Sequence, residues 1–139
     1  MTATNRPEAR SEGRPGRVLV VDDDTDVRET VVTTLEVAGF RVLETDNPHE
    51  GLALLRAHPD ICLVLLDLMM PTMTGFQFRD EQRRDTRIAA IPTVIVTGSP
   101  VGAEERDRLQ ATDYLSKPVS RADLLAVVAT YCEPTRSDR

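Results

Sequence analysis

The sequence lacks three features that would each assign it to a particular class of protein. It has no run of about 18 apolar residues, the length that a membrane-spanning helix needs, and no hydrophobic signal core at its N-terminus. It has no basic excess, because the net charge is -6 and the pI is near 4.9, which argues against nucleic-acid binding as the main function. It has only two cysteines, a pattern that favours reduced thiols over a disulfide framework or a metal cluster. We therefore expect a cytoplasmic protein in which Cys62 is a small core residue.

What is present fits one globular domain. The chain has 139 residues, of which 40% are apolar and 29% charged. Residues 1–16 combine Pro, Gly, Ser, Thr and mixed charge with almost nothing to bury, which predicts a flexible tail more than a basic targeting peptide. We expect the domain to span residues 17–131 and a short tail to follow over residues 132–139.

Apolar runs of strand length alternate with amphipathic stretches of helix length along the domain. This alternation predicts parallel strands joined by crossover helices. The expected strands are residues 17–21, 40–44, 61–66, 92–96 and 113–116. The predicted fold class is therefore α/β, with a doubly wound, flavodoxin-like (βα)5 sheet in the strand order 2-1-3-4-5.

Helix boundaries are marked by polar caps. Asp24, Asn47 and Ser120 each stand where a helix should begin, and Gly39 suits the end of the first helix. The helix after residue 75 offers only Phe76 and Phe78 to the core before its sequence turns polar, so we expect it to be exposed and weakly anchored. The next helix should be short, ending near residue 110.

Polar side chains follow four of the predicted strands directly. Asp22 and Asp23 follow the first strand, Asp67 the third, Thr97 the fourth and Lys117 the fifth. The carboxyl ends of the strands form the ligand crevice of an open parallel sheet. Three carboxylates gathered there repel one another unless a divalent cation and an ammonium group share the site. Mg²⁺ suits such hard oxygen ligands and leaves room for a phosphoryl oxygen.

This set of residues predicts phosphoryl chemistry. Asp67 would attack phosphorus, while Mg²⁺ and Lys117 neutralise the transferring group and the Thr97 hydroxyl donates to one of its oxygens. The resulting acyl phosphate can be hydrolysed by water. Temporary modification of this kind is the chemistry of a switch.

Four segments together resemble the receiver domain of two-component response regulators. They are VLVVDDD (18–24), LVLLDLMMPTMTG (63–75), PTVIVTG (92–98) and DYLSKP (113–118), and the resemblance extends from about Arg17 to Tyr131.

The resemblance implies a role for each matching residue. Asp67 would accept a phosphoryl group from a phosphohistidine on a sensor histidine kinase or a histidine phosphotransfer protein. Asp23 would bind Mg²⁺ directly, Asp22 through water, and Met69 through its carbonyl. Lys117 would contact the phosphoryl group, aimed by a cis bond to the following proline.

The resemblance also implies a switch and an output surface. Thr97 and Tyr114 would form the switch pair, altering a surface that binds a downstream protein. The chain departs from the family pattern at Thr74, Gly98 and Val119 without losing an essential charge, while the segment between residues 97 and 117 is about two residues short. That shortening affects the partner-binding face of the fourth helix, fifth strand and fifth helix. We expect a single-domain receiver that does not itself bind nucleic acid and that is either a monomer or a homodimer, although a fragment of a longer regulator is an alternative.

Other interpretations fit the residues less well. DDDTD could be only a helix cap, and Asp24 fits that role. The segment does not fit a calcium-binding loop, because Val27 stands where such a loop needs a glycine. Met69 and its two neighbouring methionines have no nearby His or Cys to complete a soft-metal site. The segments VLVVDDDTD and VIVTG resemble two motifs of haloacid-dehalogenase-like phosphatases, but the first motif needs Thr or Val where Asp26 stands. A docking module without phosphoryl transfer is the remaining alternative.

Overall fold

A computed structural model describes residues 14–134, so the parts of the two expected tails at residues 1–13 and 135–139 lie outside the described chain. The main sheet has five parallel strands: β2 (Arg17–Val21), β3 (Arg41–Thr45), β4 (Ile61–Asp67), β5 (Thr93–Thr97) and β6 (Asp113–Ser116). They lie in the order β3-β2-β4-β5-β6. Counted along the chain this is 2-1-3-4-5, which confirms the predicted fold.

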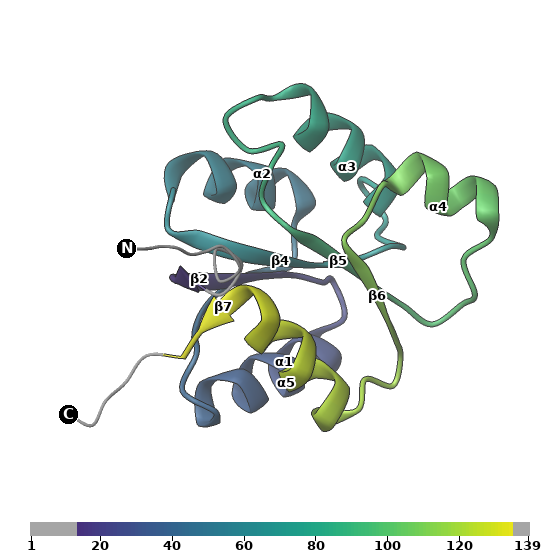
Figure 1. Ribbon diagram of the computed structural model, residues 1–139. Coiled ribbons are helices and arrows are strands. Elements are labelled where there is room, and N and C mark those ends of the chain that lie inside the picture. The colour runs from purple at the N-terminus through teal and green to yellow at the C-terminus, as the bar shows by residue number, and fades with distance from the viewer. Residues whose placement is uncertain (1–13, 135–139) are drawn as a thin grey trace, which may run out of the picture.

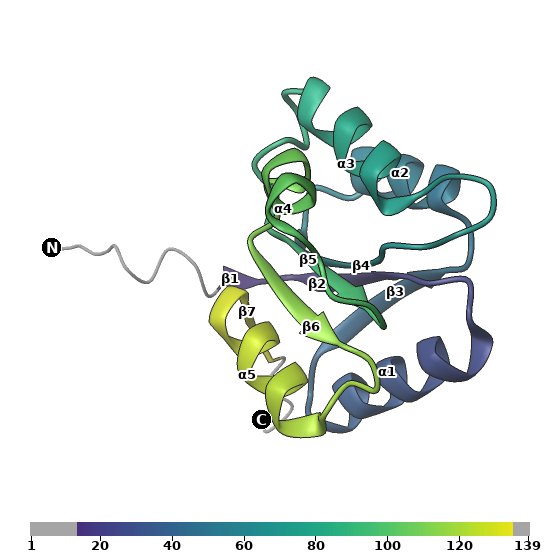
Figure 2. The ribbon, with the colours of Figure 1, turned by 90° about the vertical axis from the view of Figure 1, so that its right-hand side faces the viewer.

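Helices cover both faces of the sheet. One face carries α1 (Thr25–Val37) and α5 (Arg121–Tyr131), and the other carries α2 (Pro48–Ala57), α3 (Gly75–Arg84) and α4 (Ala103–Leu109) (Figures 1 and 2). Alternate side chains of β4 enter the two cores, with Leu65 in one and Leu66 in the other. Every residue of β4 is buried, as its continuous apolar sequence predicts.

The predicted helix caps are confirmed. The side chains of Asp24, Asn47 and Ser120 each accept a hydrogen bond from a backbone N–H in the first turn of α1, α2 and α5, respectively. Gly39 follows α1 with φ 99°, a left-handed conformation that favours glycine. In the described chain, no helix has both the length and the apolar character required to cross a membrane.

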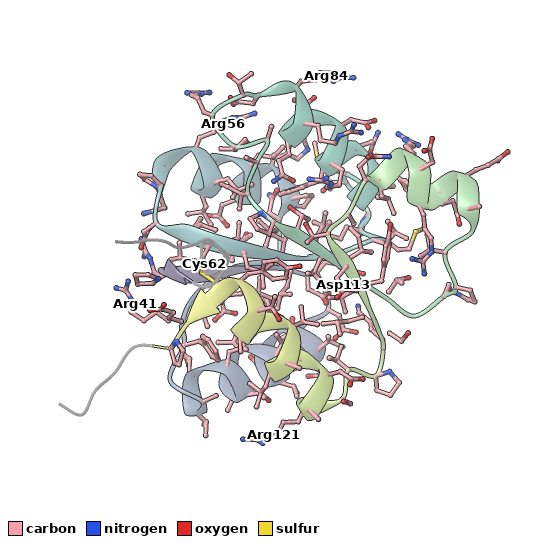
Figure 3. All side chains as sticks on the ribbon, in the orientation of Figure 1. Arg41, Arg56, Cys62, Arg84, Asp113 and Arg121 are labelled. Atoms are coloured by element: carbon pink, nitrogen blue, oxygen red, sulfur yellow. A yellow bond between two sulfur atoms is a disulfide. The ribbon has the colours of Figure 1, made fainter. Side chains whose placement is uncertain are left out.

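The expectation of two reduced thiols is wrong, because Cys62 and Cys132 form a disulfide (Figure 3). Cys62 lies on β4 and Cys132 begins the two-residue strand β7 (Cys132–Glu133), which pairs with β1 (Arg14–Pro15). The end of α5 brings the two cysteines together although 70 positions separate them. Cys62 is nevertheless a buried core residue, as expected. Both short strands lie in segments that the sequence analysis assigned to the tails.

The expectation that α3 is exposed and weakly anchored is also wrong. Phe78, Arg79 and Gln82 on its inner side are all buried. A count of apolar residues missed this face, because two of these side chains are polar and are buried through hydrogen bonds to each other and to the backbone. α4 has only seven residues, in line with the predicted shortening.

Candidate functional site

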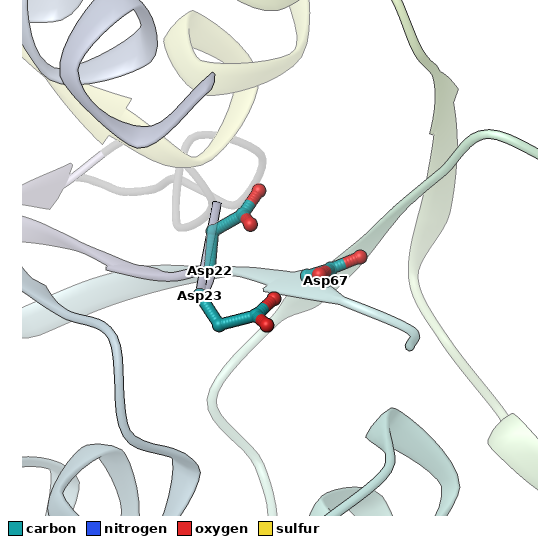
Figure 4. A group of neighbouring side chains, drawn as sticks. All are labelled: Asp22, Asp23 and Asp67. Atoms are coloured by element: carbon teal, nitrogen blue, oxygen red, sulfur yellow. The ribbon is translucent and has the colours of Figure 1, made fainter. Parts of the chain in front are cut away.

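The register of the sheet brings the predicted acids together. Val21 of β2 pairs with Leu66 of β4, so the next residues, Asp22 and Asp67, lie side by side at the carboxyl edge. Asp23 adds a third carboxylate, and one oxygen from each lies within 4.8 Å of the others. Figure 4 shows the three side chains together at the ends of the two strands.

The same edge carries the predicted ammonium and hydroxyl groups. Thr97 is paired with Ser116, and Lys117 follows directly. The Lys117 Nζ lies 3.2 Å from Asp22 Oδ2 and 3.3 Å from Asp67 Oδ1. Lys117 therefore joins two of the three acids in one charged cluster, and its bond to the following proline is cis, as the resemblance implies.

Burial governs the charges of this cluster. Asp22 is 4% and Asp67 6% exposed. Burial and the neighbouring Asp22 raise the pKa of Asp67 to about 6, although Lys117 opposes the shift. Burial lowers the pKa of Lys117, but the attraction of Asp67 and Asp22 outweighs it, so the net shift is upward. An ionised site carries three negative charges against one positive charge.

The donor set fits a hard divalent cation. Asp22, Asp23 and Asp67 offer carboxylate oxygens without nitrogen or sulfur, the chemistry that Mg²⁺ prefers. Asp23 is exposed while the other two are buried, so the cluster is open to solvent on one side. A bound divalent cation would balance the excess negative charge that raises the pKa of Asp67.

Backbone hydrogen bonds orient the buried acids. The Asp24 N–H donates to Asp22 Oδ1 at 2.9 Å, and the Met69 N–H donates to Asp67 Oδ1 at 3.4 Å. The Arg28 guanidinium donates to the Asp22 carbonyl at 2.8 Å. Sequence analysis missed Arg28, because this contact depends on the turn that α1 makes over the strand end. The Met69 side chain is 65% exposed, and the part of its carbonyl in metal binding stays a prediction.

Thr97 and Tyr114, the predicted switch pair, contact other residues rather than each other in this conformation. The Thr97 hydroxyl donates to the Ser99 carbonyl and accepts from the Ser99 N–H, both at 3.2 Å. The Tyr114 ring is half-buried, with the guanidinium carbon of Arg106 4.1 Å from its centroid. Sequence analysis missed this cation–π contact, which only the packing of α4 on β6 creates.

Comparison with known proteins identifies the family. Residues 18–129 match the family described as the response regulator receiver domain. The chain belongs to this family. It is 36% identical to protein PilH of Pseudomonas aeruginosa over 115 residues, covering 81% of this chain and 93% of PilH.

Longer regulators and solved structures agree with this assignment. The chain is 36% identical over 129 residues to the DNA-binding dual master transcriptional regulator RpaA of Synechocystis, covering 88% of this chain but only 51% of RpaA. The chain therefore spans about half the length of that relative. The chemotaxis protein CheY4 of Vibrio cholerae superposes with a TM-score of 0.77 at 28% identity, covering 84% of this chain and 98% of CheY4.

The protein is thus a receiver domain of two-component signalling, similar to single-domain chemotaxis receivers. Receiver domains are signalling phosphoacceptors that interact with histidine kinases and downstream targets and bind Mg²⁺ in an acidic pocket. The family assignment replaces the phosphatase alternative.

Proposed function

We propose that Asp67 accepts a phosphoryl group from a phosphohistidine on a sensor histidine kinase or a histidine phosphotransfer protein. The observation that carries this proposal is the single ammonium of Lys117 within 3.3 Å of Asp67 and 3.2 Å of Asp22. Two buried carboxylates held beside one lysine form a site in which an arriving phosphoryl group finds both a nucleophile and a countercharge.

The transfer follows from these positions. An oxygen of Asp67 forms a bond to phosphorus as the phosphorus–nitrogen bond of the donor breaks, and the leaving imidazole takes up a proton. Lys117 stabilises the negative charge on the transferring group. The Thr97 hydroxyl exchanges its bond to the Ser99 carbonyl for one to a phosphoryl oxygen.

The cation requirement is part of the proposal. Asp22, Asp23, Asp67 and the carbonyl of Met69 would hold Mg²⁺. When bound, Mg²⁺ supplies positive charge that neutralises the carboxylates and the phosphoryl oxygens. That charge would lower the pKa of Asp67 from its metal-free value of about 6, so the carboxylate would stay ionised, and therefore nucleophilic, below neutral pH as well.

The modified state would act as a switch. Movement of Thr97 toward the phosphoryl group would draw Tyr114 after it and alter the surface offered to a downstream protein. Recognition of that protein and self-catalysed dephosphorylation belong to the same proposal. A cytoplasmic location also belongs to it, but it rests on the histidine-kinase partner alone, because the Cys62–Cys132 disulfide removes the argument from reduced thiols. Homodimer formation and the lack of nucleic-acid binding remain predictions.

Phosphorylation of the intact protein tests the proposal. The chain is incubated with Mg²⁺ and phosphoramidate or acetyl phosphate, and its intact mass is measured. We expect one added phosphoryl group on the wild type, none on Asp67→Asn, and none on the wild type in excess chelator. Asp46→Asn is the matched control, because Asp46 is an exposed acid after β3 at the same edge of the sheet. A phosphoryl group on both the wild type and Asp67→Asn, or on neither, contradicts the assignment.

Partner binding separates the switch from a docking module. Phosphorylated wild type and Asp67→Asn should bind a downstream protein with different affinities. Equal binding by the two would favour a docking module.

The lifetime of the phosphorylated state gives a second test. Met69 lies two residues after Asp67 and has no polar side-chain group that could orient an attacking water, so we expect slow self-hydrolysis. Met69→Asn should release phosphate faster in a phosphate-release assay. Equal rates for the two proteins would refute the role of Met69.

A further inference from the structure

We propose that Arg79 is a positioning residue for the switch, because it holds the end of α4, and with it Tyr114, in the conformation of the unphosphorylated chain. The inference rests on the proposed function, since it concerns how the signal at Asp67 reaches α4 and β6. Movement of α4 would require Arg79 to give up its partners.

Arg79 is a buried cation without an acidic partner. It is 5% exposed, and within residues 14–134 no carboxylate forms an ion pair with it. Its guanidinium donates instead to the carbonyls of Leu109 at 2.8 Å and Gln110 at 2.6 Å, and to Gln82 Oε1 at 2.8 Å. Burial lowers its pKa, yet an arginine side chain remains protonated in proteins. A buried charge is tolerated only while such acceptors surround it.

α4 depends on this contact, because its other side-chain contacts with α3, such as the Arg108–Asp80 ion pair at 2.9 Å, lie at the surface. Leu109 is its only buried side chain. Gln110, which caps the helix, has φ 49°, a left-handed conformation that is unfavourable for a residue other than glycine. Arg79 binds the carbonyls of these two residues, so it stabilises both the last turn and the strained cap. Displacement of α4 would leave the guanidinium buried with only one acceptor.

Further hydrogen bonds hold Arg79 in place. Gln82 Nε2 donates to the carbonyls of Ile88 and Ile91, each at 3.2 Å. The Thr93 hydroxyl at the start of β5 donates to Gln82 Oε1 at 3.1 Å. The orientation of the guanidinium is therefore tied to the sheet and to the loop before β5.

The N-terminus of α3, the helix that carries Arg79, is held against the end of β4, the strand that carries Asp67. The Gly75 N–H, at the start of α3, donates to the Leu68 carbonyl at 2.7 Å, and Leu68 follows Asp67 directly. A Cβ at position 75 would lie 2.9 Å from the Leu68 Cα, so this approach requires glycine. α3 thus connects the phosphorylation site at one end with the α4 cap through Arg79.

The connection ends at the switch tyrosine. Tyr114 follows the α4 cap by four residues, and Arg106 of α4 lies over its ring. A change in the position of α4 therefore changes the surroundings of Tyr114. Arg79 acts on Tyr114 through α4 and also directly, because the two side chains interact electrostatically, and it does not touch the phosphoryl site.

Hydrogen exchange of residues 103–112 tests this inference. Wild type, Arg79→Met, Arg79→Lys and Arg84→Met are compared before and after phosphorylation, which intact mass verifies. Arg84 is the matched control, because it lies on the same helix but is exposed and pairs with Glu81 of α3 at 3.9 Å.

We expect unphosphorylated Arg79→Met to exchange about tenfold faster in this segment, from loss of hydrogen bonds to a charged donor. Phosphorylation should then change its exchange much less than it changes that of the wild type. Arg84→Met should match the wild type, and Arg79→Lys, which keeps the charge but loses the planar set of guanidinium donors, should be intermediate. If Arg79→Met fails to fold by circular dichroism, Arg79→Lys decides the question.

Two results would overturn the inference. One is wild-type exchange of residues 103–112 in unphosphorylated Arg79→Met, and the other is a phosphorylation response equal to that of the wild type. Wild type that gains no phosphoryl group would refute the proposed function instead, and the comparison of unphosphorylated proteins would still decide the role of Arg79.

Discussion

At the scale of single residues, the charge at Asp67 is costly in the metal-free fold, and that cost has a functional meaning. The carboxylate is buried at the end of an apolar strand, beside Asp22, with Lys117 as a partial compensation. Sites that hold charges at the expense of stability are typical of functional centres. A cation and a phosphoryl group are the partners that would use this imbalance.

The cost of Asp67 should appear as a dependence of stability on pH. In the folded chain its pKa is about 6, above the ordinary value of 3.8, so the folded state binds the proton more tightly than the unfolded state. In chelator, its contribution to the free energy of unfolding should fall as pH rises from about 4 to about 6, by up to roughly 3 kcal/mol. Urea unfolding should show Asp67→Asn more stable than the wild type at pH 7. If the difference in free energy of unfolding between the wild type and Asp67→Asn is the same at pH 4 and pH 7, this prediction is wrong.

Lys117 offers a direct view of the site, because it is the only lysine in the sequence. A chain labelled with ¹³C in lysine should give one Cε resonance, whose pH titration reports the pKa of Lys117. We expect Asp67→Asn to lower that pKa, since it removes one of the two carboxylates that raise it. Asp113→Asn, at an exposed acid on the same strand as Tyr114, should leave it unchanged. An unchanged titration in Asp67→Asn would show that the ammonium lies elsewhere.

Sequence reasoning worked for these residues because their positions follow from strand ends. Each parallel strand delivers its next residue to one edge, so the meeting of Asp22, Asp67 and Lys117 could be predicted. Arg28 and Arg106 could not, because each reaches its partner only through the packing of a helix on a strand end.

At the scale of elements, α3 is the helix whose role the sequence concealed. Its apolar residues alone indicated an exposed helix, whereas its inner side is completed by Arg79 and Gln82. Local signals such as caps and apolar runs predicted the five strands of the main sheet and the other helices to within a few residues, because those signals act over short distances along the chain. Burial of a polar side chain depends on acceptors distant in the chain.

The anchoring of α3 can be measured through its two phenylalanines. Phe78 is fully buried, so Phe78→Ala should lower the free energy of unfolding by about 3–5 kcal/mol. Phe76 is only half-buried, and Phe76→Ala should cost markedly less. Denaturant unfolding of the two variants provides the comparison. If both variants lose a similarly small free energy of unfolding, α3 is the weakly anchored helix that its sequence suggests.

At the scale of the whole molecule, the disulfide closes the domain. Cys62 lies in the central part of the sheet and Cys132 follows α5, so the bond ties the end of this helix to the core across a separation of 70 residues. Spacing along the sequence gave no sign of this pairing, because it depends on where α5 ends relative to β4. The short pair of β1 and β7 lies beside it and carries too few residues for an apolar pattern.

Loss of this bond should weaken the whole fold. A loop of this length corresponds to about 4 kcal/mol in the chain-entropy account, and native disulfides commonly contribute about 2–4 kcal/mol. We expect a dithiol reductant to lower the free energy of unfolding of the wild type by that amount. The reductant should not change the free energy of unfolding of the double variant Cys62→Ala, Cys132→Ala. If it also leaves that of the wild type unchanged, and the denatured wild type has two free thiols, the cysteines are not bonded.

The central claim is that the carboxylate of Asp67 receives the phosphoryl group, and direct mapping of the modified residue tests it. The chain is phosphorylated with phosphoramidate and Mg²⁺, reduced with borohydride, which converts an aspartyl phosphate to homoserine, and digested for peptide mass spectrometry. We predict homoserine at position 67 and at neither Asp22 nor Asp23. Homoserine at another position, with Asp67 unmodified, would contradict the account.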